Sequence, residues 1–135
     1  MEPTELIAFH EKFRIAELRI LDTAHWTWSV RPAQPTLGAT VLSLRRHAAA
    51  FADVSQAEMA DLGTAIASVE RATRAAFGND KINYLMLMMV DPHVHFHVLP
   101  RDASTPRFAG RDWPDASWPG PPSLAAEPCP ADALS

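Results

Sequence analysis

The stretch His-Val-His-Phe-His-Val-Leu at residues 93–99 decides how the rest of this 135-residue chain is interpreted. It places His93, His95 and His97 at alternate positions, with one apolar residue between each pair. Because successive side chains of a β-strand point to opposite faces, the three imidazoles would share one face. An imidazole, with an unperturbed pKa of roughly 6.5, can act as nucleophile, base or acid near neutral pH. The stretch therefore predicts a strand with a chemical role.

The segment before the histidines indicates the other half of a β-hairpin. Ile82–Val90 is almost wholly apolar and follows Gly78, which favours a strand covered on both faces. Asp91 and Pro92 come next. Since proline fixes φ and removes a ladder donor, these two residues predict a tight connection between the strands.

Periodicity predicts three further strands and two helices. The strands cover residues 17–21, 25–30 and 39–44, and an amphipathic helix covers residues 4–15. The clearest helix begins at Ser55-Gln-Ala-Glu58, which has the capping-box form, and ends near Gly78.

The length of the chain suits a single domain with one core. After Arg101 the pattern changes, because seven prolines follow with little periodicity. We assign residues 1–101 to the domain and residues 102–135 to a proline-rich tail, which either belongs to the same domain or is partly flexible. The one cysteine, Cys129, excludes a disulfide within a monomer.

Composition excludes several classes of protein. The chain is 47% hydrophobic and 21% charged, as is typical of a globular protein. Its formal net charge of -4 argues against a general nucleic-acid binder. No apolar run is long enough to span a bilayer, and the first residues lack the basic start of a secretory signal. We expect a cytoplasmic protein that binds neither nucleic acid nor membranes.

With Pro100 and Arg101 added, the histidine stretch resembles the signature of the histidine triad (HIT) family of nucleotide hydrolases and transferases. The resemblance extends to Gly38 before a short strand, to the basic residues 45–47 after it, to the long helix and to Asn83. It implies an α+β fold of the HIT type. That fold has an antiparallel sheet of about five strands, a long helix packed on the sheet and an N-terminal helix.

In that family the middle histidine of the motif attacks the α-phosphorus of a nucleoside phosphate derivative, and water then hydrolyses the nucleotidyl-imidazole. The resemblance implies that His95 is this nucleophile and that His93 and His97 assist in phosphate binding and proton handling. The uridylyltransferase branch has glutamine where this chain has His97, so the chain resembles the hydrolase branches. The implied substrates are dinucleoside polyphosphates or nucleoside phosphoramidates. No metal or other cofactor is implied, and the implied assembly is a homodimer.

Four more residues are candidates for substrate binding. Arg31 either contacts ribose or phosphate or is solvated at the surface, and His47 either binds phosphate or decorates the end of a strand. Asn83 serves either the site or hydrogen bonding at a strand end, and Trp118 is either a lid over the site or an anchor for the tail.

Three features depart from the well-studied hydrolase branches. Ala39 stands where they have a histidine, and Leu87 stands where a polar residue is expected. The short Asp91-Pro92 turn replaces a glycine-rich loop. These departures leave two alternatives open: a nucleotide-binding or sensing module with little turnover, and a protein that binds metal through its His-X-His pairs.

Overall fold

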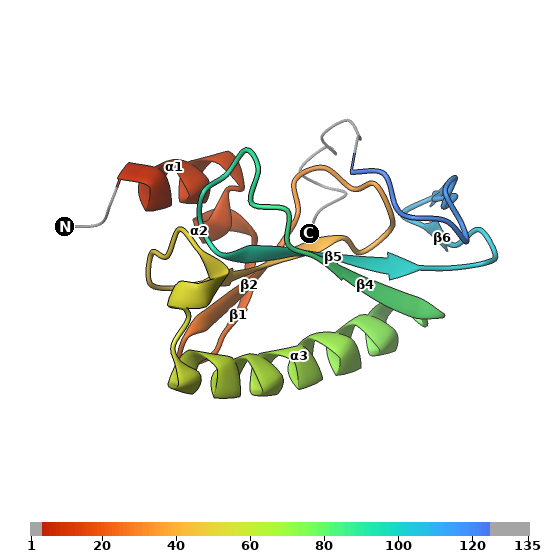
Figure 1. The fold of residues 1–135 in the computed structure, drawn as a ribbon. Coiled ribbons are helices and arrows are strands. Elements are labelled where there is room, and N and C mark those ends of the chain that lie inside the picture. Colours follow the sequence, from red (N-terminus) through yellow and green to blue (C-terminus); the bar gives the residue numbers. More distant parts are fainter. Residues whose placement is uncertain (1–3, 125–135) are drawn as a thin grey trace.

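A five-stranded antiparallel sheet organises the molecule in our computed structural model, which describes residues 4–124 (Figure 1). The strands are β1 (Arg19–Asp22), β2 (Trp26–Val30), β3 (Thr40–Leu44), β4 (Lys81–Leu85) and β5 (His95–Arg101). They lie in the order β1-β2-β3-β5-β4, and every neighbouring pair is antiparallel. The predicted α+β fold with about five antiparallel strands is confirmed.

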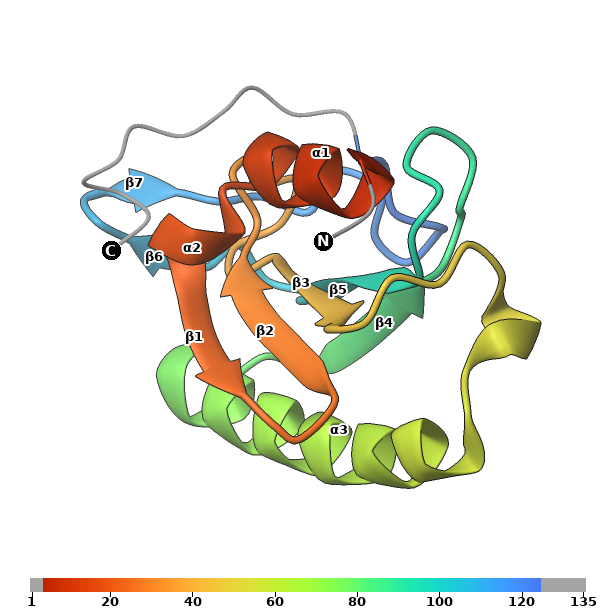
Figure 2. The same cartoon turned by 90° about the vertical axis from the view of Figure 1, so that its left-hand side faces the viewer.

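One face of the sheet is covered by the long helix α3 (Gln56–Phe77) (Figure 2). The Ser55 side chain accepts a hydrogen bond from the Glu58 N–H at 3.1 Å, and the Glu58 carboxylate accepts one from the Ser55 N–H at 2.8 Å. Gly78 ends the helix at a φ of 62°, which glycine adopts without a steric penalty. The predicted helix and both of its end signals are confirmed. Neither α3 nor another helix within residues 4–124 is long and apolar enough to cross a bilayer.

The hydrophobic core lies between α3 and the sheet. Its buried members come from all three of the central strands, from α3 and from the segments beside them: Trp26, Trp28, Leu42, Leu44, Ala48, Leu62, Ala65, Val69, Val94 and Val98. Trp26 donates its indole N–H to the Glu58 carbonyl at 2.9 Å, which connects the core to the first turn of the helix.

The opposite face of the sheet is covered by two short helices, α1 (Thr4–Lys12) and α2 (Ile15–Leu18) (Figures 1 and 2). The prediction of one helix over residues 4–15 is wrong at its end, because Arg14 has a φ of 52° and breaks the helix. The strand β1 begins at Arg19, two residues after the start of the strand predicted over residues 17–21, because α2 occupies residues 15–18.

The connection between β4 and β5 differs most from the prediction. The two strands do pair as a hairpin, with Leu85 opposite His97. However, β4 ends at Leu85, so the predicted strand over residues 82–90 is too long by five residues. Met89 and Val90 are 86% and 79% exposed. Their apolar side chains therefore contribute no hydrophobic burial that would hold this segment in the sheet. The connection therefore spans residues 86–94 and is not a tight turn.

After β5 the chain stays against the domain as far as it is described. A two-residue hairpin forms from β6 (Arg107–Phe108) and β7 (Arg111–Asp112). Trp113 is buried, and its indole N–H donates to the Phe108 carbonyl at 2.9 Å. Asp115 forms a buried ion pair with Arg101. Cys129 lies outside the described residues.

Candidate active site

Two of the three motif histidines lie on β5 and face away from α3. In the register of the sheet, His95 is opposite Ser43 and His97 is opposite Val41. The intervening Phe96 packs against the core under α3, so the two imidazoles point to the other face. Both are nearly inaccessible to solvent, with 2% and 6% of the residue exposed.

His93 precedes β5 instead of lying in it, which corrects the prediction of three histidines on one strand. Its Nε2 lies 2.7 Å from the Leu44 carbonyl oxygen, and its Nδ1 accepts a hydrogen bond from the Ala48 N–H at 3.4 Å. A ring nitrogen that accepts carries no proton, so the proton is on Nε2, which donates to Leu44. His93 is therefore a neutral imidazole held by two segments of main chain.

The tautomer of His95 is set by the residue two positions before it. The Nδ1 of His95 lies 2.5 Å from the His93 carbonyl oxygen, and a carbonyl only accepts, so Nδ1 is the protonated nitrogen. Among residues 4–124, no hydrogen bond engages the other ring nitrogen, Nε2. His95 thus carries an available lone pair on Nε2, which is the requirement for a nucleophilic imidazole.

Phe9 of α1 and Phe13, the residue after this helix, form an aromatic cover over the histidines. The Phe9 ring centroid lies 5.0 Å from that of His93 and 4.9 Å from that of His95. Phe13 continues this cover, with its centroid 5.9 Å from those of His95 and His97. The stripe of apolar residues on the N-terminal helix therefore packs on the motif itself, which the sequence alone did not indicate.

Burial is the largest cause that lowers the pKa of each motif histidine. It brings the pKa of His93 to about 4, against the opposing effect of the hydrogen bond to Leu44. The pKa of His97 also falls to about 4, since burial acts together with the nearby His95 and Arg31. Burial likewise lowers the pKa of His95, although the His93 carbonyl and Asp91 oppose it. All three imidazoles are therefore neutral at pH 7.

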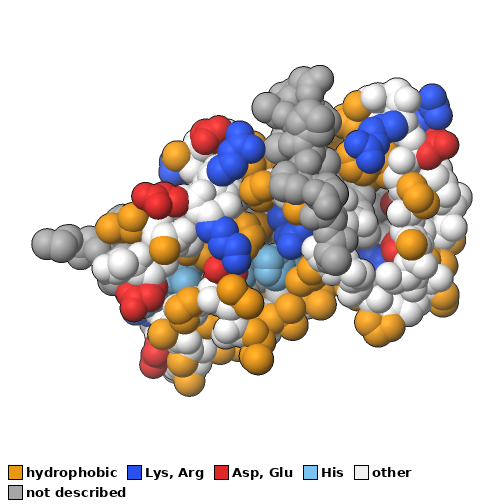
Figure 3. Space-filling model, turned by 90° about the horizontal axis from the view of Figure 1, so that it is seen from above, with side chains coloured by type: hydrophobic (Ala, Val, Ile, Leu, Met, Phe, Trp, Pro, Cys, Tyr) orange, Lys and Arg blue, Asp and Glu red, His pale blue; other side chains and the backbone are white. Residues whose placement is uncertain are grey.

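A pocket of about 200 Å³ opens beside His95 and His97. Histidine atoms are visible there beside basic and hydrophobic side chains in the view from above (Figure 3). Lys12 lies at its edge and pairs with Asp91 at 2.8 Å. The remaining wall comes from the residue after α1, the strand-connecting segments and one residue near the end of the described chain: Phe13, Arg31, Leu87, Met88, Met89, Val90 and Leu124.

Arg31 is the candidate ligand that the structure brings to the histidines. It lines the same pocket, and its Nη1 donates to the Ala33 carbonyl at 2.8 Å. Its Nε is buried without a hydrogen-bond partner among residues 4–124. Burial lowers the pKa of Arg31, but a guanidinium stays charged in proteins. Arg31 thus gives the site a positive charge and an N–H donor that has no partner among residues 4–124.

The structure places the other three candidate ligands in two different locations. His47 stacks on His93, with ring centroids 5.4 Å apart and planes inclined by 17°. Asn83 accepts a hydrogen bond from Arg101 Nη1 at 2.7 Å, and Trp118 lies 6.0 Å from the Arg101 guanidinium. His47 is thus beside the motif, whereas Asn83 and Trp118 meet at Arg101, the last residue of β5.

The three sequence departures also have definite positions. Ala39 is fully buried just before β3, and Leu87 is half exposed in the loop that lines the histidine pocket. The expected short turn is wrong, because Asp91 and Pro92 lie inside a loop that spans residues 86–94. Lys12 was not singled out from the sequence, and its place in the pocket wall and its salt bridge to Asp91 reveal it as part of the site.

The arrangement of the histidines also bears on the metal-binding alternative. His93 and His95 each commit the N–H of one ring nitrogen to a main-chain carbonyl. Within the described part of the chain, no group of three or more His, Cys, Asp or Glu side chains is placed to hold a metal ion. The described site therefore offers imidazole nitrogens without a converging set of ligands.

Comparison with known families agrees with this geometry. A profile of the HIT domain matches residues 28–104. That range is more than half of the chain and contains His93, His95 and His97. The chain belongs to the HIT domain family. As a HIT protein it has the fold that the resemblance implied, and its three motif histidines lie within the matched range.

Solved HIT structures share this fold over most of the chain. A histidine triad protein from Bradyrhizobium japonicum has a TM-score of 0.67 at 27% identity, covering 89% of this chain and 84% of that one. A HIT protein from Sinorhizobium meliloti has a TM-score of 0.67 at 21% identity, covering 88% and 84%. The NitFhit protein of C. elegans has a TM-score of 0.61 at 26% identity, covering 70% of this chain but only 24% of that one. Comparison with curated protein sequences gives no match.

Proposed function

We propose that this HIT protein hydrolyses a nucleoside phosphate derivative at its α-phosphate, through a covalent nucleotidyl intermediate on His95. The observation that carries the proposal is the hydrogen bond from His95 Nδ1 to the His93 carbonyl oxygen at 2.5 Å. That bond leaves Nε2 with its lone pair, and the lowered pKa of His95 keeps the ring neutral at pH 7. A neutral imidazole attacks phosphorus without first losing a proton.

The reaction proceeds in two displacements. The Nε2 of His95 forms a bond to the α-phosphorus as the bond from phosphorus to the leaving group breaks, and the leaving group takes the electron pair and a proton from solvent water. A water molecule then attacks phosphorus and loses a proton to solvent, and the electron pair of the breaking P–N bond returns to Nε2. This step releases the nucleoside monophosphate and returns His95 to its neutral form. In the intermediate the imidazole ring is cationic, and its Nδ1–H donates to the His93 carbonyl. The carbonyl dipole stabilises that positive charge.

Lys12 and Arg31 supply the positive charge that a phosphate requires, because the motif histidines are neutral before substrate binds. The Arg31 Nε–H and the His97 Nδ1 are both buried without partners among residues 4–124. A phosphoryl oxygen between them would satisfy both atoms if His97 is protonated at Nδ1. The Phe13 ring at the same pocket offers an aromatic surface to a nucleobase.

Turnover of defined nucleotides tests the proposal. Adenosine 5′-phosphoramidate and a diadenosine polyphosphate, each incubated with the protein in EDTA, should release AMP. His95→Ala should lower that rate by at least about a hundredfold, whereas His25→Ala, at the turn between β1 and β2, is the matched control. Mass spectrometry of a reaction quenched in alkaline denaturant, in which a phosphorus–imidazole bond survives, should detect the nucleotidyl adduct on wild-type protein only. Equal turnover by His95→Ala would contradict the proposal.

A second candidate function follows from the burial of the site. The histidines are at most 6% exposed, and Phe9 and Phe13 cover them. A protein that binds a nucleotide and holds it without turnover would have the same features. Stabilisation of the fold by AMP, together with no product from either substrate, would favour this module over the hydrolase.

Assembly and location belong to the same proposal and rest on the resemblance to the family. We propose a homodimer that acts in the cytoplasm on a small nucleotide. Light scattering on the purified protein measures its mass in solution, and the mass of a monomer would contradict the proposed homodimer.

A further inference from the structure

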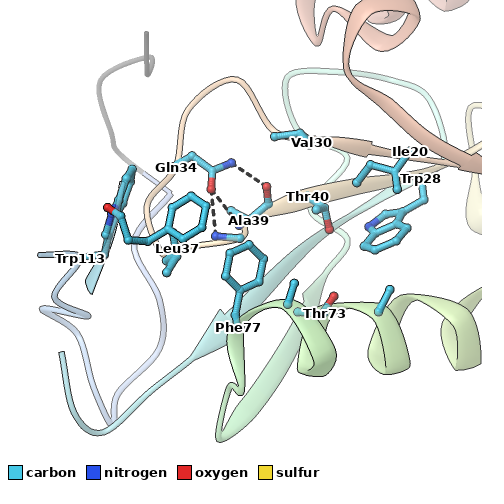
Figure 4. Close-up of a pocket in the computed structure, with 14 residues that line it drawn as sticks. Ile20, Trp28, Val30, Gln34, Leu37, Ala39, Thr40, Thr73, Phe77 and Trp113 are labelled. Carbon is cyan, nitrogen blue, oxygen red and sulfur yellow. Dashed lines mark hydrogen bonds between the residues drawn. The ribbon is translucent and has the colours of Figure 1, made fainter. Parts of the chain in front are cut away.

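A second cavity, of about 290 Å³, lies between the C-terminal half of α3 and the adjoining end of the sheet (Figure 4). Its walls come from α3, from β2 and β3, from the loop that joins these strands, and from the segment around β6 and β7. Large apolar side chains, among them Leu37, Phe77 and Trp113, surround the cavity in Figure 4.

This cavity is separate from the histidine pocket, because the sheet lies between them. Thr40 lines the cavity and is opposite Val98 in the register, so both point toward α3. His97 is the neighbour of Val98 on β5 and therefore points to the other face. The two cavities have no lining residue in common.

Two buried polar atoms at the cavity have no hydrogen-bond partner among residues 4–124: Trp28 Nε1 and Thr40 Oγ1. Trp28 is 6% exposed and Thr40 is 5% exposed, so bulk water does not readily satisfy either group. Figure 4 shows both polar atoms directed toward the space above Thr73. By contrast, the indole N–H groups of Trp26 and Trp113 each donate to a carbonyl at 2.9 Å. A buried donor without a partner is costly and calls for a ligand or an ordered water.

The chemistry of the walls restricts what the cavity can hold. No Lys, Arg, His, Asp or Glu is among its lining residues, so a charged ligand would lose its hydration without compensation. An apolar cavity of about 150 Å³ holds one benzene ring, and the cavity here has about 290 Å³. Its volume therefore suits a molecule of two fused rings.

We propose that this cavity is a binding site for an uncharged bicyclic aromatic molecule that accepts a hydrogen bond from the Trp28 indole N–H. The indole nitrogen is a donor only, so the ligand must supply the acceptor. The Thr40 hydroxyl donates or accepts and serves a second polar atom of the ligand.

The cavity is held open by the loop between β2 and β3. Gln34 fixes this loop, since its Nε2 donates to the carbonyls of Arg31 and Ala39, both at 2.7 Å, and its Oε1 accepts from the Gly38 N–H at 3.0 Å. Phe77 lies so close to Gly38 that an added Cβ there would come within 2.7 Å of the ring. The site is thus formed before a ligand arrives, which lowers the entropic cost of binding.

Quinoline and naphthalene are the probes for this proposal, because they match in size and differ in one acceptor nitrogen. In ¹⁵N-labelled protein, quinoline should shift the Trp28 indole N–H resonance, which Trp28→Phe identifies by its loss. Naphthalene should bind about three- to tenfold more weakly, as expected for the loss of one neutral hydrogen bond. The Trp26 indole resonance should stay in place, because its N–H already has a partner.

A variant that fills the cavity gives the second test. Ala76 lines the cavity and is exposed on α3, so Ala76→Leu adds bulk at the opening without disturbing the core. It should abolish the quinoline shift, whereas Gly63→Ala, on the same helix with nothing near its added Cβ, should preserve it. An unchanged Trp28 resonance at millimolar quinoline, or the same shift in Ala76→Leu, would overturn the proposal and leave the cavity to water. Neither result depends on nucleotide turnover.

Discussion

Acidification should destabilise this protein well before its carboxylates titrate, because His93 and His97 are buried as neutral rings. Their pKa values are about 4 in the folded protein and about 6.5 in an unfolded chain. Between these values the unfolded chain binds more protons, so the free energy of unfolding falls as the pH falls. From pH 7 to pH 5 each histidine accounts for a loss of about 2 kcal/mol, and the pair for about 4 kcal/mol. His95, whose pKa is also lowered, acts in the same direction.

Urea unfolding at pH 7, 6 and 5 measures this loss directly. His97→Asn should reduce the loss between pH 7 and pH 5 to about 2 kcal/mol, because only His93 of the pair then takes up a proton on unfolding. His25→Asn is the control and should retain the full loss. The reasoning is wrong if the wild-type protein loses less than about 1 kcal/mol over this range, or if His97→Asn loses as much as the wild type.

Further predictions concern single residues. Gly38→Ala should destabilise the fold by about 1 to 2 kcal/mol or more, because Gly38 has a φ of 84° and Phe77 occupies the space of the added methyl. Gly63→Ala, at an open helical position, should instead stabilise it by about 0.5 to 1 kcal/mol; thermal unfolding compares the two. Lys12→Ala should change stability by less than about 1 kcal/mol, since its pair with Asp91 is partly exposed. Under the proposed function it should also weaken AMP binding by about tenfold in calorimetry, and unchanged affinity would remove Lys12 from the phosphate site.

The elements that could be predicted from sequence are those determined by local signals. The helix α3 has an N-terminal capping box at Ser55, an apolar period of 3.6 and a glycine at its C-terminal end, and all three act within a few residues. The strands β2 and β3 were predicted within one residue at each end, since alternating residues and the flanking Pro and Gly mark them. Local chemistry was sufficient in both cases.

The loop after β4 could not be predicted because an apolar stretch need be neither buried nor paired in a strand. Residues 86–90 are as apolar as a core strand, yet Met89 is 86% exposed beside the histidine pocket. The break in the first helix is similar, because no glycine or proline stands at Arg14, where φ is 52°. Tertiary packing of Phe13 and Ile15 against Val41 accompanies that break, and a single sequence does not reveal such a contact.

The positions of the motif histidines could be predicted better than their surroundings. The spacing of the motif indicated a shared face for His95 and His97, and the sheet register places them on one. His93 reaches the same region from outside the strand, because it is bonded to Leu44 and Ala48, which are distant in sequence. The cover by Phe9 and Phe13 depends on how α1 crosses the sheet, and that crossing has no local sequence signal.

The acceptor that fixes the tautomer of His95 is a main-chain oxygen and not a side chain. Replacing the His93 side chain removes its ring but keeps its carbonyl. A substitution at position 93 therefore leaves the acceptor that orients His95 in place. A scan of single substitutions around the motif would therefore fail to detect this partner, on which the proposed attack by His95 depends. Exchange of the amide for an ester between His93 and Val94 weakens that carbonyl as an acceptor and also removes the Val94 N–H, which donates to the Ala48 carbonyl at 2.8 Å. An ester between Ala48 and Ala49, which weakens only the second acceptor, separates the two effects.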